Sequence, residues 1–349
     1  MSLKKVFLTL LLLIVVSFSF CLPSFSFPFF KKATYAPAPV QSVTTYRDVQ
    51  NNLWCVTFQL VWNELSEKFV KGPVNFVGGN PPIADELNKK LYTSDILSEE
   101  SYYTTYGKIS KKLKKQIEKN IKKKFNETSD LLGMVNWEAK NSYLFYSILK
   151  KNFNFLTAFD KLVAAPFNGS EFNVKYFGVD EKSDAKLRKN VDVLFYNSPD
   201  EYAVRLQTKE KEDVILYRTD KEDTFENYFA DVSQNQQNTK FFKEDVLNVP
   251  ELKVDKTISY DELCGRKIEG TKFVVSQALQ TIQFNLDNKG GSLKSEAIIT
   301  IMKTALEPQP TQPRYFLFNK PFVLFLMEQG KEKPYYAMKV NDTDFLVKE

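Results

Sequence analysis

Histidine is absent from this 349-residue chain. That absence removes the usual general base, the Ser-His-Asp triad and the commonest metal ligand of proteins. The chain also lacks a phosphate-binding Walker loop, a GxSxG nucleophile motif and a CxxC pair. We therefore expect a protein that is not an enzyme and that needs neither a metal nor a cofactor. Catalysis by carboxylate, lysine or tyrosine side chains is the weaker alternative, because no paired motif supports it.

Glycine, proline and cysteine are scarce, with 12, 15 and 3 residues respectively. So little glycine and proline argues against a disordered or collagen-like chain, and a hydrophobic content of 43% is enough for a large core. The cysteines, Cys21, Cys55 and Cys264, are too few and too distant for a disulfide framework. The 48 basic and 43 acidic residues nearly balance, so composition identifies no partner, and we expect no nucleic acid.

Residues 1–26 have the pattern of a signal peptide or N-terminal anchor. Lys4 and Lys5 precede residues 6–20, which are apolar apart from one threonine and two serines. The short apolar core favours cleavage, whereas the missing small-x-small site leaves an uncleaved anchor open. Residues 27–45 predict an extended linker and residues 46–349 a single domain, so we expect the protein to be secreted or attached to the cell surface.

The first part of that domain has the apolar spacing of helices. This spacing predicts helices over residues 53–69, 83–91 and 110–125, with Pro81 and Pro82 in the first turn of the second. The third helix carries eight lysines around a narrow apolar stripe: Lys111, Lys112, Lys114, Lys115, Lys119, Lys122, Lys123 and Lys124. They form either a weak polyanion-binding site or simply a solvated helix face, and we favour the solvated face.

From residue 143 onward, aromatic and β-branched runs predominate. They predict strands over residues 143–149, 190–197, 202–208, 214–218, 247–254, 273–286, 322–327 and 335–340. Short helices are predicted over residues 225–232 and 260–264. Early helices followed by many strands predict a single α+β domain rather than an alternating parallel sheet.

Several of these segments resemble serpins, in the order in which that family has them. The hairpin FNKPFV (318–323) and PYYAMKV (334–340) resembles the C-terminal strand pair, and LQTIQFNLDNKGG (279–291) resembles the strand that ends in the hinge before the reactive loop. LNVPELKV (247–254) with YDEL (260–263) resembles a strand and the helix that follows it. YLFYSILKKNFNF (143–155) resembles a central-sheet strand, with Phe153 in the position of a tryptophan.

The resemblance implies a serpin-like α+β fold. This fold has N-terminal helices, a large mixed sheet, a C-terminal antiparallel sheet and an exposed reactive loop. Between the first helix and residue 143 the chain is several tens of residues shorter than the family pattern. Helices and edge strands of the large sheet are therefore expected to be missing.

In serpins a protease cuts the reactive loop, which then inserts into the large sheet as a new strand and distorts the enzyme. By resemblance the hinge residues here are Lys289, Gly290, Gly291, Leu293 and Ser295, and the cleaved bond lies near Lys303, Thr304 and Ala305. Inhibitory serpins keep small residues after the hinge, whereas this chain has Leu293, Lys294 and Glu296 there. That difference counts against inhibition.

The strand period of two divides the segment after the hinge between two faces. One face has Gly291, Leu293, Ser295, Ala297, Ile299 and Ile301, and the other has Ser292, Lys294, Glu296 and Thr300. Insertion would then bury no charge if the first set faces inward. The β-prone run 298–302 is either a latent loop strand or a strand already resident in a sheet, and the sequence leaves both open.

We expect an exported, monomeric, serpin-like protease inhibitor whose partner is a serine or cysteine protease. The alternative is a non-inhibitory serpin-fold protein that binds or carries a ligand.

Overall fold

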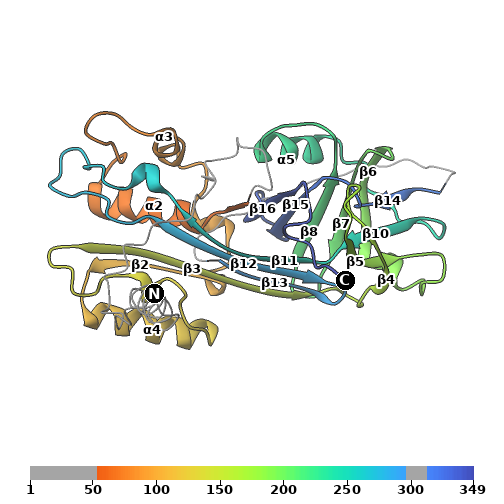
Figure 1. Cartoon of the computed structure of the whole chain (residues 1–349), viewed down its shortest axis with the longest axis horizontal. Helices are drawn as coiled ribbons and strands as arrows, with labels where there is room; N and C mark the ends of the chain where they lie inside the picture. The colour runs from red at the N-terminus through yellow and green to blue at the C-terminus, as the bar shows by residue number, and fades with distance from the viewer. Residues whose placement is uncertain (1–52, 296–312) are drawn as a thin grey trace, which may run out of the picture. The chain divides into compact units, whose positions relative to one another are not determined.

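The computed structural model describes residues 53–295 and 313–349, which lie in one compact unit, Val40–Glu349. The predicted signal segment (1–26), the linker (27–45) and the bond near Lys303, Thr304 and Ala305 fall outside the described residues. Three sheets and a small number of helices make up the described part (Figure 1).

A seven-stranded antiparallel sheet contains the C-terminal hairpin. Its order is β1 (Leu53–Cys55), β16 (Tyr336–Val340), β15 (Phe322–Glu328), β8 (Glu212–Arg218), β7 (Glu201–Gln207), β6 (Val191–Ser198) and β9 (Thr239–Lys240). Every residue of β8, β15 and β16 is buried, as in strands covered on both faces. The predicted tight succession of β6, β7 and β8 is confirmed.

A five-stranded sheet contains the segment that was predicted to be the hinge (Figure 1). Its order is β11 (Leu252–Ser259), β12 (Leu279–Asp287), β13 (Gly290–Ser295), β3 (Tyr143–Asn154) and β2 (Tyr102–Lys108). Strands β12 and β3 run in the same direction, since β13 is antiparallel to both. Because β13 lies between these two parallel-running strands, every neighbouring pair in the sheet is antiparallel.

The third sheet has four strands. Its order is β14 (Tyr315–Leu317), β10 (Val246–Pro250), β5 (Asn173–Val179) and β4 (Asp160–Pro166). Strands β10 and β14 are parallel, whereas the other neighbours are antiparallel.

Helices cover both faces of the five-stranded sheet (Figure 1). Helix α2 (Thr57–Glu64), extended by the π-helical turn η2 (Leu65–Val70), packs on β3 from one side. Helix α4 (Lys111–Phe125) packs on the other side, where Ile117 and Ile121 join Tyr146 and Ile148 in a separate small core. The other α-helices of the described residues are α3 (Pro82–Asn88) and α5 (Phe225–Gln234). Helix α5 covers β15, where the Phe229 ring contacts the Phe325 ring.

Several predicted elements have different bounds in the structure. Residues 53–55 are not helical but form β1, because they pair with β16. The predicted strand over residues 247–254 is two strands, β10 and β11, which pair with β5 and β12 in different sheets. Strand β12 begins at Leu279 rather than at residue 273, and strands β2, β4 and β5 were not predicted.

No helix within residues 53–295 and 313–349 is long and apolar enough to cross a membrane. In the same residues, no group of three or more histidine, cysteine, aspartate or glutamate side chains is arranged to hold a metal ion.

Candidate functional site

The segment predicted to be the hinge lies inside the five-stranded sheet as strand β13. Gly290 is opposite Asp287 of β12 and Asn154 of β3, and Ser295 is opposite Ile282 and Leu149. The residues Gly290–Ser295 thus form a central strand that is paired on both sides.

The two glycines allow the close approach that starts this strand. A Cβ atom on Gly290 would lie 2.1 Å from the Phe153 carbonyl oxygen, and φ at Gly290 is +154°. A Cβ atom on Gly291 would lie 2.6 Å from the Phe153 ring. Only glycine fits at these two positions without displacing β3.

Side chains of β13 alternate between the core and a more open face. Leu293 and Ser295 are fully buried, whereas Ser292 and Lys294 are half-buried. The Lys294 ammonium lies 2.6 Å from a carboxylate oxygen of Asp130, so its charge stays outside the core. Inhibitory serpins have small residues at the positions of Leu293 and Lys294. Here both residues nevertheless pair with β12 and β3 as parts of the strand.

A buried polar cluster lies beneath the last residue of β13. The Ser295 and Thr57 hydroxyls are 3.1 Å apart, and the Gln280 amide donates to the Cys55 carbonyl oxygen at 2.8 Å. The Tyr260 hydroxyl donates to the Gln280 side-chain oxygen at 2.8 Å. Burial raises the pKa of the Cys55 thiol to about 12, although hydrogen bonds with Ser295 and Thr57 act in the opposite direction.

Strand β3 extends beyond the described residues of β13. Pairing between them ends at Leu149, whereas β3 begins at Tyr143. Around this extension, the Phe69 ring centroid lies 5.0 Å from that of Tyr143, 5.7 Å from that of Phe145 and 5.0 Å from that of Phe273. The Tyr143 side chain remains 40% exposed, so this aromatic cluster is only partly covered by the described residues.

The chain re-enters the described structure at a buried ion pair. The Arg314 guanidinium lies 2.7 Å from Asp245, and it donates to the Thr239 hydroxyl at 2.8 Å and to the Lys240 carbonyl oxygen at 2.5 Å. Strand β14 follows directly and pairs with β10. Arg314 thus anchors the end of the chain segment that follows β13.

Helix α4 confirms the predicted basic helix. The helix begins after Ser110, and the Ser110 hydroxyl accepts a hydrogen bond from the Leu113 amide at 3.2 Å. Of its eight lysines, Lys111 and Lys114 form ion pairs, and Lys124 donates to two carbonyl oxygens. The other five, which make no ion pair with any described residue, are Lys112, Lys115, Lys119, Lys122 and Lys123. At 100° per residue these five fall within about 100° of arc and form one ridge.

A cavity of about 90 Å³ lies between α5 and the strands β15 and β16. Its walls are largely aromatic, with one acidic and one basic side chain: Tyr92, Phe225, Phe229, Phe325, Glu226 and Lys333. The Lys333 ammonium lies 5.2 Å from the centre of the Tyr92 ring. The sequence carried no signal for this cavity, because its walls come from segments far apart in the chain.

No protein-family model matches the chain, and no curated protein matches it. Among solved structures, cleaved Serpin 42Da matches in one crystal structure with a TM-score of 0.52 and 11% identity, over 85% of this chain and 92% of that chain. A second structure of cleaved Serpin 42Da matches with a TM-score of 0.51 and 12% identity, over 83% of this chain and 91% of that chain. Serpin48 from the insect Tenebrio molitor matches with a TM-score of 0.47 and 12% identity, over 84% and 92% of the two chains.

The similarity to cleaved Serpin 42Da extends over most of both chains, and it agrees with the α+β fold class predicted from the sequence. The three sheets, the C-terminal hairpin and the strand β13 between β12 and β3 are accordingly those of a protein with the serpin fold.

Proposed function

We propose that the protein is an exported protease inhibitor in which a protease cuts a bait loop within residues 296–312, after which the cut loop extends β13. The observation that carries this proposal is the position of Gly290–Ser295 between β12 and β3. Catalysis is not part of the proposal, since the chain has no histidine. The proposed partner is a serine or cysteine protease, and the hinge residues Lys289, Gly290, Gly291, Leu293 and Ser295 control insertion.

The register of β13 specifies where the following residues would pair. Because Ser295 is opposite Leu149, continuing the ladder would bring Ile299 opposite Phe145 and Ile301 opposite Tyr143. Directly opposite residues share a face, so both isoleucines would cover the aromatic cluster around Phe69. Insertion would therefore bury apolar surface that the described residues leave partly exposed, which stabilises the cut protein.

This proposal is tested by cutting the chain within residues 297–306 with a promiscuous protease and comparing thermal melts before and after. A large rise in Tm, together with a denaturant-resistant complex with a serine protease, is expected. A rise without a complex indicates insertion too slow to trap the enzyme. An unchanged melt without a complex would contradict the inhibitory mechanism.

Two variants separate insertion from other effects of the cut. Ile299→Asp places a charge on the face that would turn inward, and it should abolish the rise in Tm. Thr300→Asp places the same charge on the opposite face and should leave the rise intact. Equal behaviour of the two variants would argue against the register.

The cavity beneath α5 supports a second candidate, a protein that binds or carries a small aromatic molecule. Aromatic walls with Glu226 and Lys333 among them suit a planar apolar ligand with a polar end. Binding of phenol, a single-ring probe, should then be detectable by titration calorimetry, and Phe229→Arg, which would fill the cavity with a charged side chain, should prevent this binding signal. An unchanged melt after cleavage combined with this signal would favour the carrier.

The lysine ridge of α4 supports at most weak binding of a polyanion, because exposed lysines along one helix face are usually only a solvated surface. Replacing Lys112, Lys115 and Lys119 by glutamine should change elution from a heparin column only slightly at physiological salt. Tight binding that disappears in this variant would instead make the ridge a functional site.

Export is tested with residues 1–26 fused to a reporter protein. Secretion or surface attachment of the reporter is expected, whereas its retention in the cytoplasm would remove this part of the proposal.

A further inference from the structure

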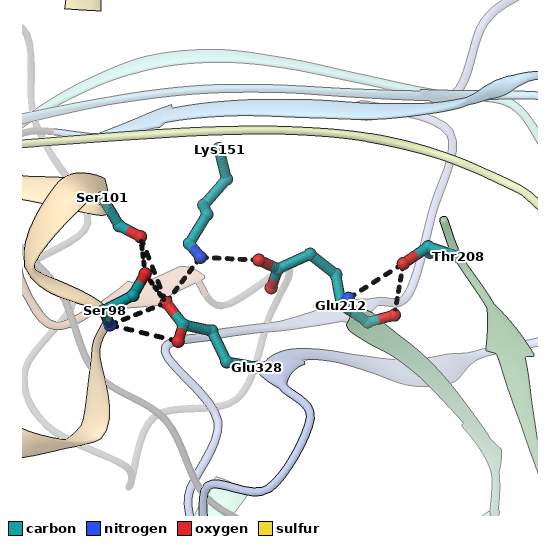
Figure 2. Close-up of polar contacts among 6 residues, drawn as sticks. All are labelled: Ser98, Ser101, Lys151, Thr208, Glu212 and Glu328. Atoms are coloured by element: carbon teal, nitrogen blue, oxygen red, sulfur yellow. Dashed lines mark hydrogen bonds and ion pairs between the residues drawn. The ribbon is translucent and has the colours of Figure 1, made fainter. Parts of the chain in front are cut away.

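A buried ion cluster joins the five-stranded sheet to the seven-stranded sheet. Lys151 of β3 lies between two carboxylates, with its ammonium 2.6 Å from Glu212 of β8 and 2.5 Å from Glu328 of β15 (Figure 2). The three side chains are 9%, 4% and 11% exposed. The five-stranded sheet thus contributes the ammonium group, and the seven-stranded sheet contributes both carboxylates.

The two carboxylates are neighbours in the seven-stranded sheet. Glu212 and Glu328 are directly opposite each other in the ladder of β8 and β15. Like charges directly opposite on one face destabilise a sheet. One ammonium offsets one carboxylate, so the cluster carries a net charge of minus one when both glutamates are ionised.

Hydrogen bonds make the two glutamates unequal. Glu328 accepts from the Ser98 amide at 3.0 and 3.1 Å, from the Ser98 hydroxyl at 2.8 Å and from the Ser101 hydroxyl at 3.1 Å (Figure 2). Glu212 has Lys151 at one oxygen and the Tyr335 hydroxyl beside its carboxylate, but among the described residues neither a backbone amide nor a serine hydroxyl donates to that carboxylate. Because Glu328 is the better stabilised anion, a proton entering the cluster goes to Glu212.

The titratable groups around Glu212 come from three elements. They are Lys151 on β3, Glu328 on β15 and Tyr335, which precedes β16. The segment containing Ser98 and Ser101 contributes only uncharged groups to the cluster. Thr208 bonds to the backbone of Glu212, at 2.8 Å from its amide, and not to its carboxylate.

We propose that Lys151, Glu212 and Glu328 form a proton-controlled tie between the two sheets, which is tight while Glu212 carries a proton and weaker once Glu212 is ionised. With the proton, the cluster is neutral and the Lys151–Glu328 pair is undisturbed. Without the proton, a second anion is held in a buried site beside the first. The inference does not depend on the proposed inhibitory function.

The sign of the pH effect follows from the same contacts. Burial raises the pKa of Glu212 from 4.5 to about 7, although Lys151 acts in the opposite direction. A raised pKa in the folded protein stabilises it fully below the unfolded value, and that stability is lost as pH rises through about 7. Burial would also raise the pKa of Glu328, but Lys151 and Ser98 outweigh burial and lower it, so Glu328 contributes no loss in this window.

Few other groups interfere in this pH window. The chain has no histidine, so the usual titrating group near pH 7 is missing. Burial also raises the pKa of Glu64, Asp213 and Glu262. Their contributions are removed by comparing variants that differ only at Glu212.

The test measures urea denaturation midpoints of the full chain between about pH 5 and about pH 8. The wild-type midpoint should fall as pH rises. Glu212→Gln, which has the shape of the protonated side chain, should make the fall in the midpoint with pH clearly smaller than in the wild type and leave the midpoint above the wild-type value at the upper end. Glu118→Gln, an exposed carboxylate on α4, is the matched control and should keep the wild-type slope.

A Glu212→Gln curve parallel to that of the wild type would overturn the proposal. Amide hydrogen exchange on the wild-type protein provides a second measurement should the variant fail to fold. Protection of the β3 and β8 amides, corrected for the intrinsic exchange rate and referenced to β5, should be lower at about pH 8 than at about pH 5. Equal protection at both pH values would overturn the proposal as well.

Discussion

Leu293 and Lys151 are directly opposite each other on strands β13 and β3. Leu293 is fully buried in the main core, and the Lys151 ammonium reaches the two glutamates of the seven-stranded sheet. Lys151, which links β3 to the seven-stranded sheet, is therefore also the residue that pairs with Leu293 in the middle of β13. Changes on either side of this pair are expected to affect the stability of β13.

Leu293→Ala should destabilise the protein by about 2–5 kcal/mol, because it removes a fully buried side chain and leaves a cavity. Lys294→Ala, one residue further along β13, removes only a partly exposed ion pair and should cost less than about 1 kcal/mol. Urea denaturation measures both. Equal losses in the two variants would contradict the inward orientation of Leu293.

Gly290→Ala should destabilise the protein by more than about 2 kcal/mol, since its Cβ atom would overlap the Phe153 carbonyl oxygen and β13 or β3 would have to move. Gly72→Ala is the control, because nothing lies within 4 Å of a Cβ atom at Gly72. The thermal melt of the control should stay close to that of the wild type. A Gly290→Ala variant as stable as the control would show that β13 does not approach β3 this closely.

Arg314→Ala should cost about 3–5 kcal/mol, because it leaves Asp245 buried without its cation. Lys89→Ala removes the exposed pair with Glu86 and should change the free energy of unfolding by less than about 1 kcal/mol. Both values come from chemical denaturation. A small effect at Arg314 would mean that β14 is anchored by its pairing with β10 alone.

Cys55 should resist thiol reagents in the folded protein, because it is 2% exposed and burial raises its pKa to about 12. Cys264 is half-buried, and burial raises the pKa of its thiol as well, but by less than at Cys55. Alkylation followed by peptide mapping should show Cys264 modified first and Cys55 only after denaturation. Rapid modification of Cys55 in the folded state would indicate that the polar cluster beneath Ser295 opens readily.

Local sequence patterns predicted a substantial part of the fold. The basic helix beginning after Ser110, the successive strands β6 to β8 and the C-terminal hairpin all follow from spacing within one segment. Strand β2 was missed, because it is polar and only partly buried, and its partner β3 supplies the pairing. Residues 53–55 were predicted to be helical, since only their contact with β16, far along the chain, makes them a strand.

In the candidate site, too, some features could be predicted from one segment of the sequence, whereas others depend on contacts between distant segments. The glycines of the hinge and the alternation of Leu293 with Lys294 are visible in the sequence, and the structure places them in β13. Thr57 and Gln280 carried no signal, because they become neighbours of Ser295 only after folding: Thr57 and Ser295 are 238 residues apart in the chain. Arg314 and Asp245 were missed for the same reason.

The sequence by itself determined the periods of the strands and helices, the charge of α4 and the lack of any histidine. Each of these depends on the order of neighbouring residues or on composition. The tertiary structure alone decided that β13 lies between β12 and β3, and that Lys151 meets Glu212 and Glu328. Strand pairing and buried charge both depend on groups that the chain brings together from distant segments, and no local pattern specifies which distant partner a strand or a charge will find.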